Sequence, residues 1–428
     1  MMYNSDLLAR RERALGKGAT LFYRQPLHIV RGEGVYLFDD TGKRYIDMYN
    51  NVPCVGHANP HVVAAMVKQA STLNVHSRYL HESIVRYAER LSAHHDKSLT
   101  TTVFTCTGTE ANEVAIMMAR CATGGRGIIC TDAAYHGNSE EVRKLKHTPV
   151  GGKGEIRSIP FPQTYRPIKE GVSETELTDL YLAEVRRVIR EFAEDGIRFA
   201  GMLVCSILAN EGLPNIPAGF MPRAAEIVRQ AGGLFIADEV QAGLCRSGRW
   251  WGYEVTGFVP DIVSMGKPLG NGLPLAGVIA REELVNKFRA STEYFNTFAS
   301  SPLQGEVGNA VLDILEKEKL CENSADVGAY LRGQLSSFTA RYDAVADVRG
   351  HGLFVGLEWV SDRAAKTPDR RGAEEAANRL KDKGFLVLNA GVLGNFLKLR
   401  PPLVFSRQHA DTFVGALGEV LQDMYGHS

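Results

Sequence analysis

The sequence predicts an α/β fold in which a mainly parallel sheet is covered by helices on both faces. Short apolar segments of strand length alternate with segments of helical spacing through the middle of the chain, a pattern typical of parallel sheets. The chain has 428 residues, too many for one simple core, so we expect two or three packed units. Its 44% hydrophobic content and 43 glycines are typical of globular α/β enzymes.

The first 60 residues are predicted to form an arm and a hairpin that pack with the C-terminal part of the chain. The segment "SDLLARRERALG" has the spacing of a short helix. Residues 34–48, "GVYLFDDTGKRYIDM", alternate apolar and polar side chains around Asp-Thr-Gly, which predicts two strands joined by a tight turn. Helical spacing follows at 60–73 and 80–95.

Residues 61–319 are predicted to form a large domain built on the parallel sheet. Expected strands lie at 101–106, 127–132, 200–206 and 232–238, and "DIVSMG" supplies another before residue 267. Expected helices lie at 109–122, 178–195 and 219–232. Acidic residues in the first turns of 109–122 favour a helix start there.

Residues 320–428 are predicted to form a smaller α+β domain. "GLFVGLEWV", "GFLVLN" and "FLKLR" have strand character, and helices are expected at 325–341, 373–383 and 408–424. The large domain would then be an insertion between the N-terminal hairpin and this unit.

Composition argues against several classes of partner. Lys plus Arg and Asp plus Glu both number 49, so no global charge favours nucleic acid or an anionic membrane. No apolar run reaches 18 residues. Seven cysteines without a CxxC pair indicate reduced thiols, and we expect a cytoplasmic protein. The Arg-rich N-terminus is compatible with organelle targeting, but Asp6 and Glu12 argue against it.

In a parallel sheet, ligands bind at the carboxyl ends of the strands, so the residues after each strand are candidates for a site. "TCTGTEANE" (105–113) places Gly108 and the hydroxyls of Thr107 and Thr109 at a helix N-terminus, which suits a phosphate group. A merely capped helix is the alternative. "AYHGN" places Tyr135 and His136 after the next strand, where core packing or a structural histidine is the alternative.

Two charged side chains follow further strands. Asp238 comes directly after four apolar residues and will be partly buried, with a cap as the alternative; Gln241 follows closely. Lys267 lies in "VSMGKPLGNG", between an apolar run and glycines. A buried lysine can form a Schiff base with a carbonyl, and a solvated loop lysine is the alternative. A phosphate turn, an aromatic ring, a buried acid and a lysine, in this order, together fit pyridoxal 5'-phosphate.

These segments resemble the class III aminotransferases, the ornithine and 4-aminobutyrate type of the fold-type I pyridoxal-phosphate enzymes. The resemblance extends through "TGTEAN", "AYHG", "ADEVQAGLCRSG", "PDIVSMGKPLGNGLPLAGV", "NTFASSPLQG" and "DVRGHGLFVGLEWV". It implies a large domain with a mainly parallel sheet, a smaller α+β domain, pyridoxal 5'-phosphate as cofactor, and a homodimer with shared active sites.

The resemblance also implies roles for individual residues. Lys267 would form the Schiff base and move a proton, and Asp238 would pair with the pyridine nitrogen. The remaining cofactor contacts would be Gly108, Thr109, Tyr135, His136, Val240 and Gln241, with Thr297 reaching the phosphate from the neighbouring subunit.

The sequence departs from the family pattern on the substrate side. Ser206 and Ile207 stand where a Glu-Pro pair is expected, so an arginine switch held by that glutamate is in doubt. "LKLRPPLVF" places Lys398 where many members carry the carboxylate-binding arginine, with Arg400 directly before the prolines. We expect Asn51, Tyr79, and Lys398 or Arg400 to line the substrate pocket.

The sequence therefore predicts an aminotransferase that moves an amino group from an amine or amino acid to a 2-oxo acid, by a ping-pong mechanism through a pyridoxamine-phosphate form. Phospholyases of the same family share "NNVPCVGH"-like and "NVHSRYLHE"-like runs, so an elimination lyase is the first alternative. A non-catalytic binding protein is the remote one. No HExxH, GxSxG or zinc-type cysteine pair occurs, so no metal site is predicted.

Overall fold

The central element of the fold is a seven-stranded sheet, described here from a computed structural model that covers residues 2–426. Its strand order is β4-β10-β9-β8-β7-β5-β6. The strands are β4 (Thr101–Thr105), β10 (Ala276–Ala280), β9 (Ile262–Met265), β8 (Leu234–Asp238), β7 (Phe199–Cys205), β5 (Gly127–Thr131) and β6 (Ile156–Ile159). Strands β9, β8, β7, β5 and β6 pair in parallel, and β10 pairs antiparallel with both β4 and β9.

Alternate residues of these strands face two separate cores. Ile236 of β8 belongs to a core shared with α4 (Gly108–Thr123), α5 (Glu140–Arg143) and α9 (Glu282–Ser291). Phe235 and Ala237 belong to a core on the other face. That core is shared with α3 (Glu82–Ala93), α6 (Glu174–Glu194), α7 (Phe220–Gln230) and α10 (Pro302–Lys317). Burial on both faces explains why the strands are almost entirely apolar.

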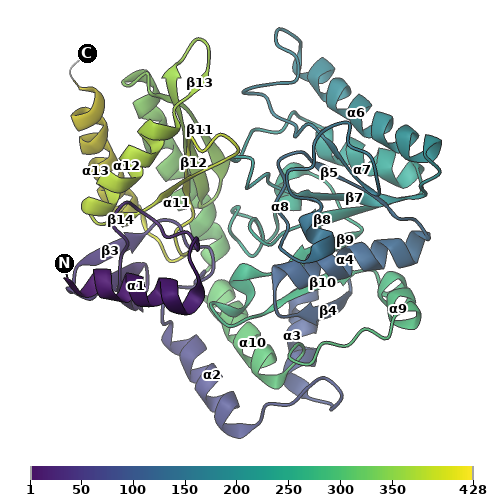
Figure 1. Cartoon of the computed structure of the whole chain (residues 1–428). Helices are drawn as coiled ribbons and strands as arrows, with labels where there is room; N and C mark the ends of the chain where they lie inside the picture. The colour runs from purple at the N-terminus through teal and green to yellow at the C-terminus, as the bar shows by residue number, and fades with distance from the viewer. Residues whose placement is uncertain (1, 427–428) are drawn as a thin grey trace.

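The N-terminal hairpin extends into the C-terminal half of the chain. Strands β1 (Ile29–Glu33), β2 (Tyr36–Asp39) and β3 (Arg44–Asp47) form an antiparallel meander, and β3 pairs in parallel with β14 (Phe385–Leu386). Figure 1 shows this purple segment beside the yellow-green α12 (Arg370–Asp382) and the yellow α13 (Arg407–Tyr425), while α2 (Pro60–Thr72) projects from the body of the molecule.

The C-terminal unit is an antiparallel sheet with helices, in the order β11-β12-β16-β15. Its strands are β11 (Val345–His351), β12 (Phe354–Asp362), β16 (Phe396–Leu399) and β15 (Leu388–Ala390), with β13 (Thr367–Pro368) paired to β12. The helix α11 (Leu320–Ser336) begins five residues before the expected start at 325, and it continues into η2 (Ser337–Ala340).

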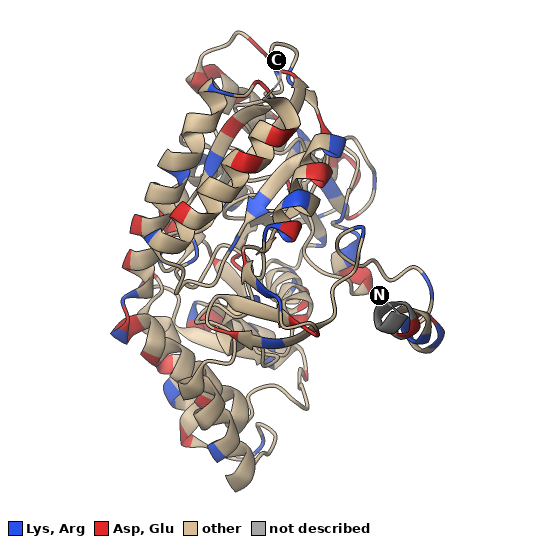
Figure 2. Ribbon diagram, turned by 90° about the vertical axis from the view of Figure 1, so that its left-hand side faces the viewer, with Lys and Arg blue, Asp and Glu red and all other residues tan. Residues whose placement is uncertain are grey.

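Helix α1 (Met2–Leu15) stands beside the body of the molecule, and acidic and basic side chains are interspersed along the ribbon (Figure 2). Among the helices of residues 2–426, none combines the length and apolar character that a bilayer span requires. Helix α8 (Gly252–Thr256) and η1 (Lys267–Gly270) are short elements next to the sheet.

Candidate active site

A cavity of about 120 Å³ lies where the carboxyl ends of the parallel strands converge. Its lining consists of Gly108, Thr109, Tyr135, His136, Gly137, Cys205, Asp238, Val240, Gln241 and Lys267. Of the residues that the sequence predicted as cofactor contacts, the cavity therefore brings together all except Thr297. The parallel register explains the convergence, because β7 to β9 end level with one another: Cys205 pairs with Asp238, and Asp238 with Ser264.

Lys267 follows β9 and begins η1. The chain passes close to α4 at this point, since a Cβ on Gly266 would lie only 3.3 Å from the Cα of Gly108. Lys267 has a φ of 20°, which is strained for a residue with a side chain. Burial lowers the pKa of its amine, and the charge of Arg400 lowers it further, while Asp238 opposes the shift. The lysine is thus neutral, and nucleophilic, more often than a solvated one.

Asp238 ends β8 and is buried. One carboxylate oxygen accepts from Nδ1 of His136 at 2.7 Å and from the amide of Asn112 at 2.9 Å; the other accepts from the backbone N–H of Val240 at 2.9 Å. Burial raises the pKa of Asp238, but the hydrogen-bond partners of the carboxylate, His136 foremost, together outweigh it, so the pKa lies below its usual value. The acid is held ionised in the interior.

Asn112 is a site residue that the sequence did not reveal. Besides Asp238, its amide donates to the carbonyl of His136, and its oxygen accepts from Ser264. It lies four residues after Gly108 on α4, on the helix face that meets the strand ends. A buried asparagine on an otherwise apolar helix face was the available signal.

The N-terminus of α4 forms one end of the cavity. Thr107 and Glu110 form a capping box: Thr107 Oγ1 accepts from the N–H of Glu110, and Glu110 accepts from the N–H of Thr107. The first N–H groups of a helix have no partner within it, which makes this end suitable for an anion. Gly137 has a φ of 146°, and a Cβ there would lie 2.6 Å from Thr109 Oγ1, so only glycine fits beside the helix start.

The predicted substrate residues divide into two groups. Gln241 connects the cavity to the C-terminal unit, since its amide oxygen accepts from Arg400 at 2.5 Å and its backbone carbonyl accepts from Asn51 at 3.1 Å. Asn51 also accepts from Nε of buried Arg246, which the sequence did not single out. Lys398 is buried and donates to the carbonyl of Ala209 at 3.0 Å.

Tyr79 and Thr297 lie elsewhere. Tyr79 is 67% exposed and stacks on His76, and Thr297 is exposed in the loop before α10. Neither lines the cavity of its own chain. A substrate role for Tyr79 within one subunit is thus at odds with its position on the surface.

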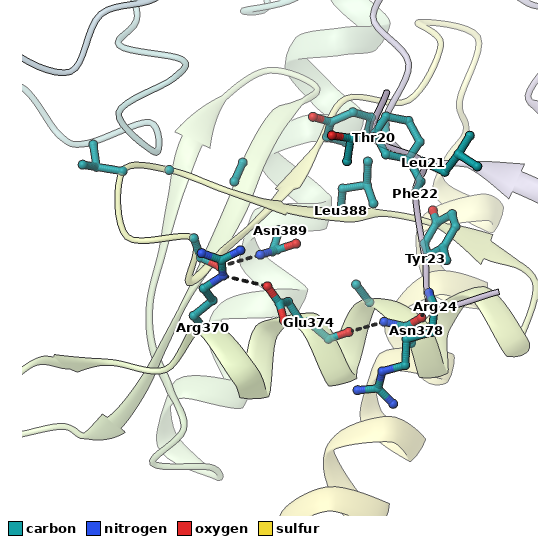
Figure 3. Close-up of a pocket in the computed structure, with 16 residues that line it drawn as sticks. Thr20, Leu21, Phe22, Tyr23, Arg24, Arg370, Glu374, Asn378, Leu388 and Asn389 are labelled. Carbon is teal, nitrogen blue, oxygen red and sulfur yellow. Dashed lines mark hydrogen bonds and ion pairs between the residues drawn. The ribbon is translucent and has the colours of Figure 1, made fainter. Parts of the chain in front are cut away.

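A second, open cavity of about 610 Å³ lies between residues 20–24, α12 and the segment 388–394. In Figure 3, Arg370 and Glu374 pair across one turn of α12, and Asn378 bonds to Arg24. Tyr49 also lines this cavity, and the Arg400 guanidinium lies 4.5 Å from the centre of its ring. Tyr49 therefore lies between the open cavity and the residues around Lys267.

Comparison with known proteins identifies the family. Residues 22–421 match the family model described as aminotransferase class-III. The chain belongs to this family. The match to the class-III aminotransferases includes the hairpin, the seven-stranded sheet with its cavity and most of the C-terminal unit.

Individual relatives of this class-III aminotransferase cover nearly all of it. It is 35% identical to the Drosophila melanogaster protein named alanine--glyoxylate aminotransferase 2-like, over 97% of this chain and 87% of the relative. It is also 35% identical to the Arabidopsis thaliana protein named alanine--glyoxylate aminotransferase 2 homolog 2, mitochondrial, over 98% and 87%. A phospholyase from Arthrobacter, solved in complex with phosphoethanolamine, is 38% identical, with a TM-score of 0.93 over 97% of this chain and 99% of that one.

The family confirms the predicted fold class and cofactor. This class-III aminotransferase has the fold-type I arrangement and is an enzyme that depends on pyridoxal 5'-phosphate. The cavity suits that cofactor: it offers an amine, an ionised acid, a helix N-terminus with a glycine cradle, and a buried Nε2 of His136 that has no partner in the described part of the chain.

The predicted cytoplasmic location is wrong for this class-III aminotransferase. The Arabidopsis relative is named mitochondrial, which points away from the cytoplasm. The seven cysteines are free, as expected, but free thiols only argue against an oxidising environment and do not distinguish one reducing compartment from another.

Proposed function

We propose that the cavity around Lys267 is the active site and that this enzyme transfers an amino group from a short amino acid or amine to a small 2-oxo acid. The observation that carries the proposal is one buried cavity that combines Lys267, whose amine has a lowered pKa, with Asp238, whose carboxylate is held ionised. The names of the Drosophila and Arabidopsis relatives make alanine and glyoxylate the first substrates to test.

We assign each of these residues a role that its position in the cavity supports. Pyridoxal 5'-phosphate supplies an aldehyde that captures amines and a ring that accepts the electrons released when the substrate carbon loses a proton. Nζ of Lys267 is the attachment point and then the base that moves that proton. With the cofactor bound, the carboxylate of Asp238 would pair with the ring nitrogen and keep it protonated. Gly108 and Thr109 would hold the phosphate at the start of α4, and Tyr135 and Val240 would contact the ring.

The test is a matrix of amino donors and 2-oxo acids with added cofactor. We expect alanine to yield pyruvate only when an oxo acid such as glyoxylate is present, with one oxo acid consumed for each amino group moved. Product formation is followed by chromatography. If none of the donor and acceptor pairs reacts, amino transfer is not the function.

Elimination is a second candidate function on the same site. It is favoured by the likeness to the Arthrobacter phospholyase, the solved structure described above with 38% identity. Both reactions begin when a base removes the same proton, so Lys267 and Asp238 would keep their roles. Release of ammonia and phosphate from an amine phosphate without any oxo acid would identify the lyase.

We also propose that the enzyme acts as a homodimer whose sites are shared. Large apolar side chains are exposed on the segment around Thr297 and on the segment before α3: Tyr79, Leu80, Phe295 and Phe298. The two segments involved lie together, since the Arg78 guanidinium is 4.3 Å from the centre of the Phe295 ring. Thr297 lies in this region, away from its own cavity. A second copy covering this surface would place Thr297 near the partner's phosphate site.

Subunit mixing tests the shared site. Thr297→Ala should weaken cofactor affinity about 10- to 100-fold, the value of a hydrogen bond to a charged group. Mixing it with inactive Lys267→Ala should restore activity, because one site of the mixed dimer then has both wild-type residues. Cofactor titration and activity measure this. Mixtures no more active than Thr297→Ala alone would mean that the threonine does not act across the interface.

A further inference from the structure

Arg246 is a buried arginine that joins three parts of the chain. It lies after β8 in the segment "GLCRSG" and is 1% exposed. Its Nε donates to the side-chain oxygen of Asn51 at 2.8 Å. Its Nη1 donates to the backbone carbonyls of Leu353 at 2.9 Å and Pro401 at 2.5 Å. Asn51 follows the N-terminal meander, and the two carbonyls belong to the C-terminal unit, so one side chain holds both parts against the large domain.

The backbone around Arg246 is shaped to hold the side chain in place. Leu244 and Cys245, which precede it, both have positive φ, 54° and 68°, a strained conformation for residues with a side chain. The carbonyl of Arg246 accepts from Oγ of Ser324 on α11 at 3.0 Å. The turn between β11 and β12 packs directly on this segment, since a Cβ on Gly352 would lie 2.6 Å from the same carbonyl oxygen. Strained backbone of this kind is typical of functional sites.

Burial of this guanidinium is costly. Within the part of the chain that the structure describes, no carboxylate lies at ion-pair distance from Arg246, and its Nη2 has no hydrogen-bond partner. Burial lowers the pKa of Arg246 to about 9, so the group is still charged at neutral pH. An apolar side chain would fill the same space without the cost of a buried charge. The retained arginine therefore indicates a role beyond packing.

Two routes lead from Arg246 to Gln241, which lines the cavity of the candidate active site. By the first route, Nδ2 of Asn51 donates to the backbone carbonyl of Gln241 at 3.1 Å, while Arg246 holds the oxygen of the same amide. By the second, the anchored Pro401 directly follows Arg400, whose Nη1 donates to the side-chain oxygen of Gln241 at 2.5 Å. Arg246 therefore acts on both the backbone and the side chain of one cavity residue.

We propose that Arg246 is a positioning residue of the active site, which holds Gln241 in the orientation where its amide donates to the ring hydroxyl of the cofactor. The orientation of that amide is fixed, because its oxygen accepts from Arg400 and its nitrogen donates to Asn210 at 3.2 Å. The second hydrogen of the nitrogen is left for the cofactor. This role rests on the proposed function, which places the cofactor in the cavity around Lys267.

Arg246→Lys tests this role by spectroscopy, without turnover. Lysine keeps the charge but loses the fork that reaches Asn51 and both carbonyls at once. We expect the pH midpoint of the absorbance titration of the bound cofactor to rise by about 0.7 unit, the value of one hydrogen bond, because an N–H donor no longer stabilises the deprotonated form. Asn51→Ala interrupts only the first route, so it should raise the midpoint by less. An unchanged midpoint in Arg246→Lys would overturn the proposal.

A double-mutant cycle shows whether the effect passes through Gln241. Gln241→Ala should itself raise the midpoint of the titration, because the donor is then absent. Adding Arg246→Lys to Gln241→Ala should change the midpoint by less than about 0.2 unit, since the two residues act on the cofactor through the same group. Two shifts that simply add would contradict the relay.

Arg157→Lys is the matched control. It changes another buried arginine, one that lies on the edge strand β6 and pairs with Asp195. It should leave the midpoint at the wild-type value, whatever its effect on the melting temperature, and a shift as large as that of Arg246→Lys would count against the proposal. Absence of cofactor at Lys267 in the wild-type protein would mean failure of the proposed function instead, so the two failures are distinguishable.

Discussion

Replacing Lys267 with alanine is expected to reduce turnover by at least about 10⁴-fold, because one side chain supplies both the attachment point and the proton-transferring base. The protein should still fold and bind cofactor non-covalently, since Asp238 and the start of α4 are unchanged. Initial rates with alanine and glyoxylate give the loss, and the absorbance of bound cofactor shows retention.

Lys287→Ala provides the control for this lysine. Lys287 lies on α9, outside the cavity, and donates to the carbonyl of Ala122. Activity should therefore stay at the wild-type level. Borohydride reduction of the wild-type enzyme followed by peptide mapping should locate the cofactor at position 267. Label at any other lysine, or a Lys267→Ala enzyme with wild-type rates, would show that the assignment is wrong.

Asp238→Asn is expected to lower kcat by about 10²- to 10³-fold with the fold intact. A carboxylate about 4 Å from a protonated ring nitrogen contributes roughly 4 kcal/mol at an effective dielectric of about 20, which equals about three pKa units. The amide removes that charge while keeping the size of the side chain and its contact with Asn112. The measurement is kcat, together with thermal unfolding to show that the fold is retained.

The neighbouring acid is the matched control. Glu239 is also buried, but its oxygens accept from the backbone N–H groups of Gly252 and Tyr253 at 2.8 Å and do not line the cavity. Glu239→Gln should change kcat less than about tenfold. Similar losses in both variants would mean that general destabilisation, and not the charge at Asp238, explains the result.

Protonation of Asp238 should not limit activity at moderately low pH. The pKa of Asp238 is lowered in the folded protein by its hydrogen-bond partners, His136 foremost. The carboxylate is therefore ionised at every pH above the usual pKa of an aspartate, and it is protonated only as the pH falls through the lower pKa of the folded protein. A loss of activity between pH 5 and 8 would accordingly have to come from other groups.

Much of the sheet was predictable because its strands are buried on both faces and read as apolar runs. Two strands were not. β6 has the sequence Ile-Arg-Ser-Ile, in which buried Arg157 pairs with Asp195, so its polar centre conceals a core strand. β10 consists of small and aliphatic residues after a glycine-rich turn, and its antiparallel direction follows from the short return of the chain after η1.

The sequence by itself determined most of the strand-and-helix order, the family, and the predicted cofactor contacts after the strands that meet in the cavity, because parallel strands place their carboxyl ends at one edge of a sheet. Only the tertiary structure decided how these residues are compensated. His136 is 102 positions from Asp238, Asn112 is 126, and no local pattern pairs them. The tertiary structure also buries Lys398 and Arg400 with no carboxylate of residues 6–426 at ion-pair distance. The balance of buried charge depends on which side chains meet in space.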